Sequence, residues 1–135
     1  MGRGIYKVDE DLTLLERVLQ LHGDFRRTLE PIRVTPLQVA TLLSLSRHEK
    51  AKLTDVAATL RVRPPTLTDV VKGLVQKRWV TKRRSITDTR VVHLGLSRWG
   101  NALIRQIEQR LAQVNATLVE RNQKPLGTIP KGRRA

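Results

Sequence analysis

The chain has 135 residues, which is the length of a single domain with a modest core. Its 26 Lys and Arg residues outnumber its 12 Asp and Glu residues, and the resulting net charge of +14 indicates a polyanionic partner. The sequence contains no cysteine and no apolar run of membrane-spanning length, which excludes disulfides, thiolate chemistry, cysteine-ligated metals and a membrane span. We therefore expect one soluble, cytoplasmic domain.

The first predicted element is an amphipathic helix over residues 8–30. The acidic residues 9–11 favour the positive end of a helix and mark its start. Pro31 ends it, because proline disfavours helical geometry in the residue before it. The apolar stripe is wide for a small domain, so we expect a second chain to cover part of it. The stripe consists of Leu12, Leu14, Leu15, Val18, Leu19, Leu21, Phe25 and Leu29.

Two short helices are predicted next. Thr35, Pro36 and Gln38 form a capping box with proline at the first helical position. The helix that they start runs to about Ser46. Thr54 then caps a short helix over residues 55–60. The apolar face of the helix from Pro36 consists of Leu37, Ala40, Leu42 and Leu43.

A turn at residues 61–63 leads into a third helix. This helix is expected to begin near Pro65, because Pro64 precedes a proline and is disfavoured in helical geometry. Together with the helix over 55–60 it makes a helix-turn-helix. Its helical period separates an apolar face from a polar one. The apolar set is Leu67, Val70, Val71 and Leu74, and the polar set is Pro65, Thr66, Asp69, Lys72 and Gln76, with Thr68 at the boundary.

The period then changes from helix to strand. Residues 79–82 and 91–96 are predicted strands, and the polar residues 83–90 join them into a hairpin, or wing. Ser97 caps a long helix over 97–122 whose apolar residues recur at three- and four-residue steps, a spacing typical of packed helices. Residues 123–135 are predicted to be a basic flexible tail. The apolar seam consists of Ile104, Ile107, Leu111, Val114 and Leu118.

The predicted fold class is therefore mainly α with a small β-hairpin wing, over a single domain of residues 1–122. The DNA-binding core would span residues 35–96, and the helices over 8–30 and 97–122 would flank it as dimerisation helices. The seam equally suits packing within one chain. The candidate dimerisation residues are Leu15, Leu19, Ile104, Ile107, Leu111, Val114 and Leu118.

Several motifs carry a family resemblance. They are Val-Thr-Pro-Leu-Gln at 34–38, Leu-Thr-Asp-Val-Ala at 53–57, Pro-Thr-Leu-Thr at 65–68 and, around the hairpin, Arg84, Asp88-Thr89-Arg90, Leu96-Ser97 and Gly100. With the order of the elements, they make most of residues 8–120 resemble the multiple-antibiotic-resistance regulator (MarR) family of winged-helix transcription factors. The sequence departs from the family pattern at Asp69, Gly73 and Arg78.

The resemblance implies a function and roles for two residues. It implies an obligate homodimer that binds a pseudo-palindromic operator in double-stranded DNA and often represses transcription. It also implies a small-molecule effector, commonly an aromatic acid. In the family, the Arg that matches Arg90 reaches the minor groove, and the Asp that matches Asp88 shapes the wing by pairing with it.

The distribution of charge points to DNA independently. Residues 61–90 hold nine Lys and Arg residues against two Asp residues, a net charge of +7. Phosphate neutralisation releases counterions, and a narrow minor groove attracts an Arg on a hairpin tip. The exposed start of the second helix of a helix-turn-helix reaches base edges. The candidate DNA-binding residues are Arg61, Arg63, Pro65, Thr66, Thr68, Asp69, Lys72, Lys82, Arg84, Asp88 and Arg90.

Other function classes have weaker support. His22, His48 and His93 lie in separate elements, so we expect no metal site, and the sequence has no phosphate loop, carboxylate pair or activated Ser of an enzyme. We expect no cofactor. The remaining alternatives are a nonspecific or architectural nucleic-acid-binding winged helix, including one that binds RNA, and a winged helix that docks an acidic protein. The four scattered aromatic residues argue against binding of single strands.

Overall fold

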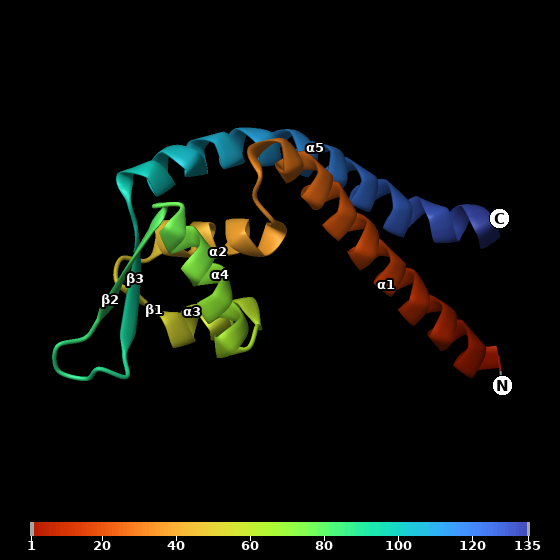
Figure 1. The fold of residues 1–135 in the computed structure, drawn as a ribbon. Helices are drawn as coiled ribbons and strands as arrows, with labels where there is room; N and C mark the ends of the chain where they lie inside the picture. The colour runs from red at the N-terminus through yellow and green to blue at the C-terminus, as the bar shows by residue number, and fades with distance from the viewer. Residues whose placement is uncertain (1, 135) are drawn as a thin grey trace. The chain divides into compact units, whose positions relative to one another are not determined.

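The structure is a computed structural model that describes the backbone of residues 2–134 and the side chains of residues 13–116. The chain divides into two compact units, one of residues 33–109 and one of residues 1–32 with 110–135. The mainly helical fold with a small sheet is confirmed (Figure 1). In chain order the elements are α1 (Gly2–Leu29), η1 (Glu30–Ile32), α2 (Pro36–Arg47), β1 (Ala51–Lys52), α3 (Leu53–Leu60), α4 (Pro64–Gln76), β2 (Val80–Arg84), β3 (Val92–Leu96) and α5 (Arg98–Arg134).

Helix α2 begins as the sequence predicts. The Gln38 N–H donates to Thr35 Oγ1 at 3.2 Å, and the Thr35 N–H donates to Gln38 Oε1 at 3.0 Å, which completes the capping box. Its predicted core face is only partly right, because Leu42 is the one predicted residue that is fully buried. Thr41 is also buried. Its hydroxyl donates to the Leu37 carbonyl at 2.8 Å, so burial leaves no polar atom of its side chain without a partner. The buried set is Val39, Thr41, Leu42 and Leu45.

Helix α3 begins earlier than the sequence predicts. Its N-cap is Lys52, in extended geometry at φ −79 and ψ 138, so the prediction of Thr54 as N-cap is wrong. The reason lies in a strand that the sequence does not reveal. Residues 51–52 form β1, which pairs antiparallel with β3, and the chain passes from this strand directly into α3. The wing is therefore part of a three-stranded sheet in the order β1-β3-β2 rather than an isolated hairpin.

Helix α4 also begins one residue before its predicted start. The carbonyl of Arg63 accepts the first helical hydrogen bond from the Leu67 N–H at 3.1 Å, so Pro64 takes the first helical position. Proline fits there because the N–H that it lacks has no partner at a helix start. Leu67, Val71 and Leu74 of the predicted apolar face are fully buried and Val70 is half-buried. The predicted polar residues Pro65, Thr66, Asp69, Lys72 and Gln76 are exposed.

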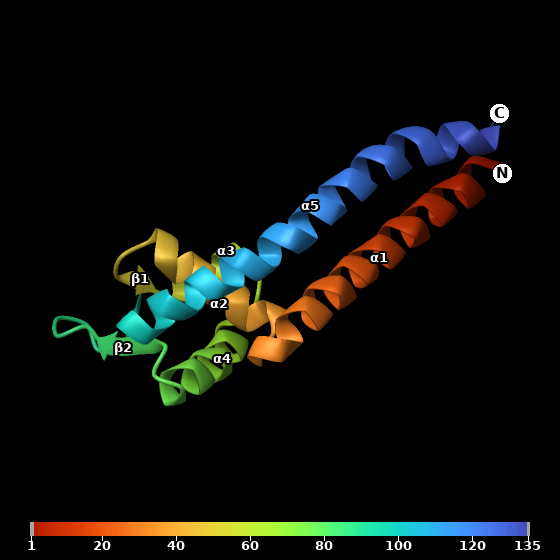
Figure 2. The same cartoon turned by 90° about the horizontal axis from the view of Figure 1, so that it is seen from above.

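The sheet closes the core of the unit of residues 33–109. In the β2–β3 register Val80 lies opposite Leu96 and Lys82 lies opposite Leu94, and Val80 and Leu94 are buried. Ser97 starts α5 as predicted, because its Oγ accepts the Gly100 N–H at 3.1 Å. The loop between β2 and β3 extends beyond the helices of this unit in both views (Figure 1, Figure 2).

The outer helices extend further than the sequence predicts. Helix α1 begins at Gly2, so the acidic residues 9–11 lie inside the helix and not at its start. Helix α5 continues to Arg134, over residues for which the sequence predicts a flexible tail (123–135). This segment of the helix includes Pro125 and Pro130. Within the part of the chain that the structure describes, no helix has the length and apolar character of a membrane span.

The candidate dimerisation residues fall into three groups. Leu15 and Leu19 on α1 are exposed, at 53% and 62%. Ile104 and Ile107 on α5 are buried within the single chain, at 5% and 0%, as the alternative of packing within one chain requires. Leu111 and Val114 are half-buried, and the side chain of Leu118 lies outside the described residues.

Candidate nucleic-acid interface

A sharp turn between α3 and α4 builds the helix-turn-helix. Arg61 ends α3 in the left-handed region at φ 57, and its N–H donates to the Ala58 carbonyl at 3.1 Å. The next N–H, of Val62, donates to the Ala57 carbonyl at 3.0 Å. These bonds satisfy the last carbonyls of α3 and reverse the chain within a few residues. The turn exposes the side chains of Arg61 and Arg63 beside the start of α4.

The start of α4 has the features of a recognition helix, with one exception among the predicted residues. Pro65, Thr66 and Asp69 are exposed on its first two turns, and Lys72 follows on the same face. Thr68 is half-buried, and its hydroxyl donates to the Pro64 carbonyl at 2.9 Å. The hydroxyl proton of Thr68 is therefore committed to the helix, which leaves its methyl group and a lone pair for any outside contact.

The wing separates its basic side chains between two faces. Residues two apart on a strand share a face, so Lys82 and Arg84 continue the face of the buried Val80 beyond the core. Arg83 lies on the opposite face of the strand. Arg84 also supports the loop, because its Nη1 donates to the Thr89 carbonyl at 3.0 Å.

The loop at the end of the wing is closed by hydrogen bonds. The Ser85 N–H donates to the Val91 carbonyl at 2.9 Å, and the Val91 N–H donates to the Asp88 carbonyl at 3.0 Å. The Asp88 N–H donates to Ser85 Oγ at 3.2 Å, and Ser85 Oγ lies 3.0 Å from Thr87 Oγ1. These contacts hold residues 86–90 as an ordered tip.

Asp88 and Arg90 form an ion pair at this tip, as the resemblance implies. Asp88 Oδ1 accepts the Arg90 backbone N–H at 3.0 Å and the Arg90 Nε–H at 3.1 Å, and Oδ2 lies 3.4 Å from Nη2. These bonds from Arg90, with a smaller contribution from the charge of Lys52, lower the pKa of Asp88 below its ordinary value of 3.8. The Arg90 side chain is 90% exposed, so the pairing orients it without covering it.

Two residues of this surface escape the sequence reasoning. Lys52 lies on β1 opposite His93, and its charge acts on Asp88 across the sheet. Its position directly before the Leu-Thr-Asp-Val-Ala motif is a signal that could have identified it, because the first helix of a helix-turn-helix crosses the DNA backbone. Ile86 lies in the wing loop and is 100% exposed. An isolated apolar residue in a polar loop gives no periodic signal.

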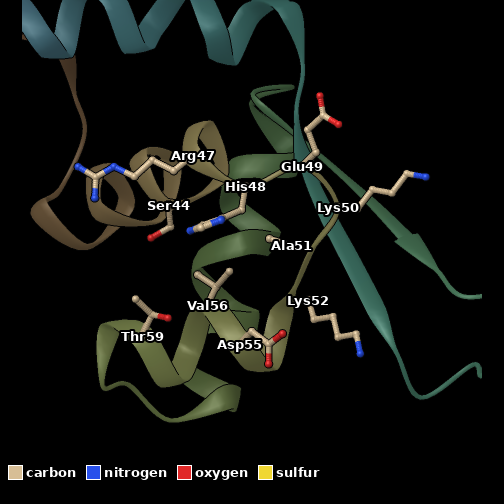
Figure 3. Close-up of a pocket in the computed structure, with 10 residues that line it drawn as sticks. All are labelled: Ser44, Arg47, His48, Glu49, Lys50, Ala51, Lys52, Asp55, Val56 and Thr59. Atoms are coloured by element: carbon tan, nitrogen blue, oxygen red, sulfur yellow. The ribbon is translucent and has the colours of Figure 1, made fainter.

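A recess lies apart from α4 and the wing. It has a volume of about 450 Å³ and is formed by the end of α2, the loop after it, β1 and α3 (Figure 3). Most of its lining residues are exposed and half of them are charged, with Val56 as its buried residue. The predicted DNA-binding residues lie elsewhere. Among the residues whose side chains the structure describes, no three His, Cys, Asp or Glu side chains gather as a metal site would require.

Comparisons with known proteins identify the central part of the chain. The model of the MarR family matches residues 34–92. The HTH-type transcriptional repressor MdtR of Bacillus subtilis (strain 168) is 26% identical over 99 residues, which are 73% of this chain and 64% of that repressor. The chain thus covers less than two thirds of the length of that relative.

Two solved structures have a similar fold. A mutant of MarR from E. coli complexed with operator DNA has a TM-score of 0.76 and 22% identity, over 95% of this chain and 94% of that one. The transcriptional repressor CouR bound to a 23-mer DNA duplex has a TM-score of 0.74 and 23% identity, over 91% and 90%. Residues 34–92 thus match the model of the MarR family, the solved structures share the fold, and the resemblance seen in the sequence is confirmed.

Proposed function

We propose that this protein is a transcription regulator that binds an operator in double-stranded DNA. The observation that carries the proposal is the combination, within residues 33–109, of an exposed α4 start with an ordered wing that presents Arg90. The relative MdtR is a transcriptional repressor, and both MarR and CouR have been solved on DNA, which supports this choice.

In this proposal each part of the surface has a distinct task. The first two turns of α4 enter the major groove, where the Thr66 methyl suits thymine and Asp69 accepts from cytosine. Arg90 enters the adjacent minor groove, whose narrow A·T-rich form concentrates negative potential. The exposed cations on the turn, α4 and the wing bind phosphates without regard to sequence. They are Arg61, Arg63, Lys72, Lys82 and Arg84.

The proposal includes a homodimer. A second copy of the chain would cover the exposed apolar residues of α1 and set two recognition helices about 34 Å apart, one turn of DNA. Both half-sites of a pseudo-palindromic operator would then be read together, and the bound protein would repress transcription. A small aromatic effector would release DNA if it bound more tightly to a dimer with a different spacing.

Selection from a random duplex library tests the function. We expect the purified protein to enrich a pseudo-palindromic sequence, and fluorescence anisotropy to show two protomers per site. The enriched duplex should bind at least about a thousandfold more tightly than a shuffled one at physiological salt. If no sequence is enriched and all duplexes bind alike, the protein is a nonspecific or architectural binder. In that case RNA duplexes are the next probe.

Replacement of Arg90 tests the wing. We expect Arg90→Ala to weaken binding to the enriched duplex at least about fivefold, because the exposed guanidinium no longer enters the minor groove. Arg83→Ala is the matched control, since it removes the same charge from an exposed residue of β2, outside the loop that carries Arg90. Thermal unfolding of both variants should match that of the wild type. Equal losses of affinity in the two variants would reduce the role of Arg90 to bulk charge.

A further inference from the structure

Ile86 is a large aliphatic residue in the most exposed position that a residue can take. Its side chain is 100% exposed, at the tip of a loop whose other residues from Ser85 to Arg90 are polar or charged. Single exposed apolar residues are common on protein surfaces. The surroundings of Ile86 distinguish it, because the loop that presents it is ordered and carries the basic residues of the predicted DNA surface.

The hydrogen bonds of the loop fix Ile86 and Arg90 at one tip. The bond from the Ser85 N–H to the Val91 carbonyl closes the loop around both residues. Arg84 ties the loop to the wing through the Thr89 carbonyl, and Asp88 holds Arg90. A wing that enters a groove of DNA therefore brings the Ile86 side chain and the Arg90 guanidinium into it together. A β-branched side chain has few rotamers to lose, so its burial costs little conformational entropy.

The charge around the tip selects the partner. Arg84 and Arg90 are exposed, and the one acidic residue of the loop, Asp88, is paired with Arg90. A tip with this charge suits a polyanion and disfavours an apolar membrane interior. The minor groove of duplex DNA is only about 6 Å wide, so it excludes a helix but admits side chains from a hairpin tip between its two rows of phosphates. Its walls are sugar edges, which offer an aliphatic side chain an apolar contact.

We propose that Ile86 inserts into the minor groove beside Arg90 as an apolar wedge that widens the groove and bends the duplex. This inference rests on the proposed DNA-binding function and assigns to the wing a second contact of a different chemistry. Aliphatic side chains of minor-groove proteins insert at base steps and bend DNA in this way. The wedge gives the wing a preference for steps that deform easily, because the cost of bending depends on the sequence that is bent.

The groove floor offers a specific probe. Guanine places its 2-amino group in the minor groove, and inosine lacks this group while its major-groove face is that of guanine. Insertion of Ile86 requires a minor-groove floor without the guanine 2-amino group. Substituting inosine for guanine in the wing segments of the enriched duplex should strengthen binding of the wild-type protein, and this gain should be smaller for Ile86→Ala.

The decisive experiment compares three proteins on the duplex enriched by the wild type. We expect Ile86→Ala to bind about tenfold more weakly, which corresponds to about 1.4 kcal/mol. It should also bend the duplex less, as measured by energy transfer between dyes at its two ends. The slope of log affinity against log salt should stay unchanged, because Ile86 contacts no phosphate. Ile86→Leu keeps the apolar volume and should stay within about twofold of the wild type.

Each outcome separates the wedge from the function on which it rests. Since Ile86 is fully exposed, its replacement should leave the unfolding temperature unchanged, and a loss of affinity then reports the contact itself. If Ile86→Ala binds and bends the duplex as the wild type does while Arg90→Ala is weakened, the wedge is wrong and the DNA-binding function stands. If the wild type selects no duplex, the proposed function fails and the wedge fails with it.

Discussion

The ion pair between Asp88 and Arg90 shows how two exposed residues acquire a defined geometry. The folded-state pKa of Asp88 is lowered. The pairing therefore stabilises the wing at pH values above the ordinary pKa of 3.8, and this stabilisation is lost as the pH falls through the lowered pKa. The pair is thus intact at neutral pH. Ion pairs of exposed side chains add little to stability, so its contribution is the orientation of Arg90.

Arg78 occupies a position that favours glycine. It follows α4 with φ 64, where its N–H donates to the Val75 carbonyl at 2.9 Å and the Trp79 N–H donates to the Leu74 carbonyl at 3.1 Å. A side chain in this left-handed geometry costs about 1 kcal/mol. We expect Arg78→Gly to raise the free energy of unfolding by up to about that amount, and the midpoint of thermal unfolding by a few degrees.

The control for this prediction is Arg78→Ala. It removes the same charge and the same long side chain but keeps the Cβ atom that causes the strain. We expect no gain in stability from it, by thermal and denaturant unfolding. A rise of equal size in both variants would attribute the effect to relief of charge repulsion rather than to the backbone.

At the scale of the residue, sequence reasoning identified most of the candidate surface. Helical period placed Asp69 and Lys72 on the exposed face of α4, and the family motif indicated the pairing of Asp88 with Arg90. It missed Lys52, because its effect on Asp88 depends on the pairing of β1 with β3. The sequence also does not predict the hydrogen bond from the Thr68 hydroxyl to the Pro64 carbonyl, because this bond depends on where α4 starts.

At the scale of the element, two glycines in helices have opposite surroundings. A Cβ built on Gly73, inside α4, meets no atom within 4 Å among the neighbours in the described chain. A Cβ built on the buried Gly100, near the start of α5, collides with the backbone carbonyl of Trp79. That carbonyl also accepts the Ser97 N–H at 3.0 Å, which limits how far it can move.

These surroundings predict opposite effects of the same substitution. We expect Gly73→Ala to raise the free energy of unfolding by up to about 1 kcal/mol, because alanine is the better helix former and restricts the unfolded chain. Gly100→Ala should lower it by about 2 kcal/mol through overpacking against Trp79. Urea unfolding measures both. A gain in stability in both variants would show that helix propensity alone governs these positions.

The predicted elements were right in kind and less accurate at their ends. Capping boxes and proline positions are local signals, so α2 was located within one residue. The start of α3 was misplaced because β1 is only two residues long and exists through its pairing with β3. The proline and glycine content of residues 123–135 favours a tail, whereas α5 continues to Arg134.

At the scale of the whole molecule, the exposed face of α1 is the feature that a single chain leaves unexplained. Four large apolar residues, Leu14, Leu15, Val18 and Leu19, are each more than half exposed on one helix. A surface of this kind is typical of a protein interface. In the proposed homodimer it is covered by a second copy.

Negative charge introduced on the exposed apolar face of α1 should separate the subunits of the proposed dimer. We expect the double substitution Leu15→Glu and Leu19→Glu to convert a dimer into a monomer in sedimentation equilibrium, because two carboxylates would have to be buried at the interface. Affinity for a full operator should fall about tenfold or more, since the two half-sites are then bound independently.

The matched control is Gln20→Glu, an exposed neighbour that gains one charge. It should remain dimeric. A wild-type protein that is already monomeric at micromolar concentration would contradict the dimer, and the exposed leucines would then require another partner.

The sequence by itself determined the order of the helices and of the two hairpin strands, the two faces of α4, the concentration of charge over residues 61–90 and the family motif of the wing. These follow from local capping, periodicity and composition, which need no knowledge of distant residues. Only the tertiary structure decided that β1 joins the sheet, that Ile104 and Ile107 are buried within the chain and that Lys52 acts on Asp88. Each of these depends on contacts between residues far apart in the chain, which no local pattern records.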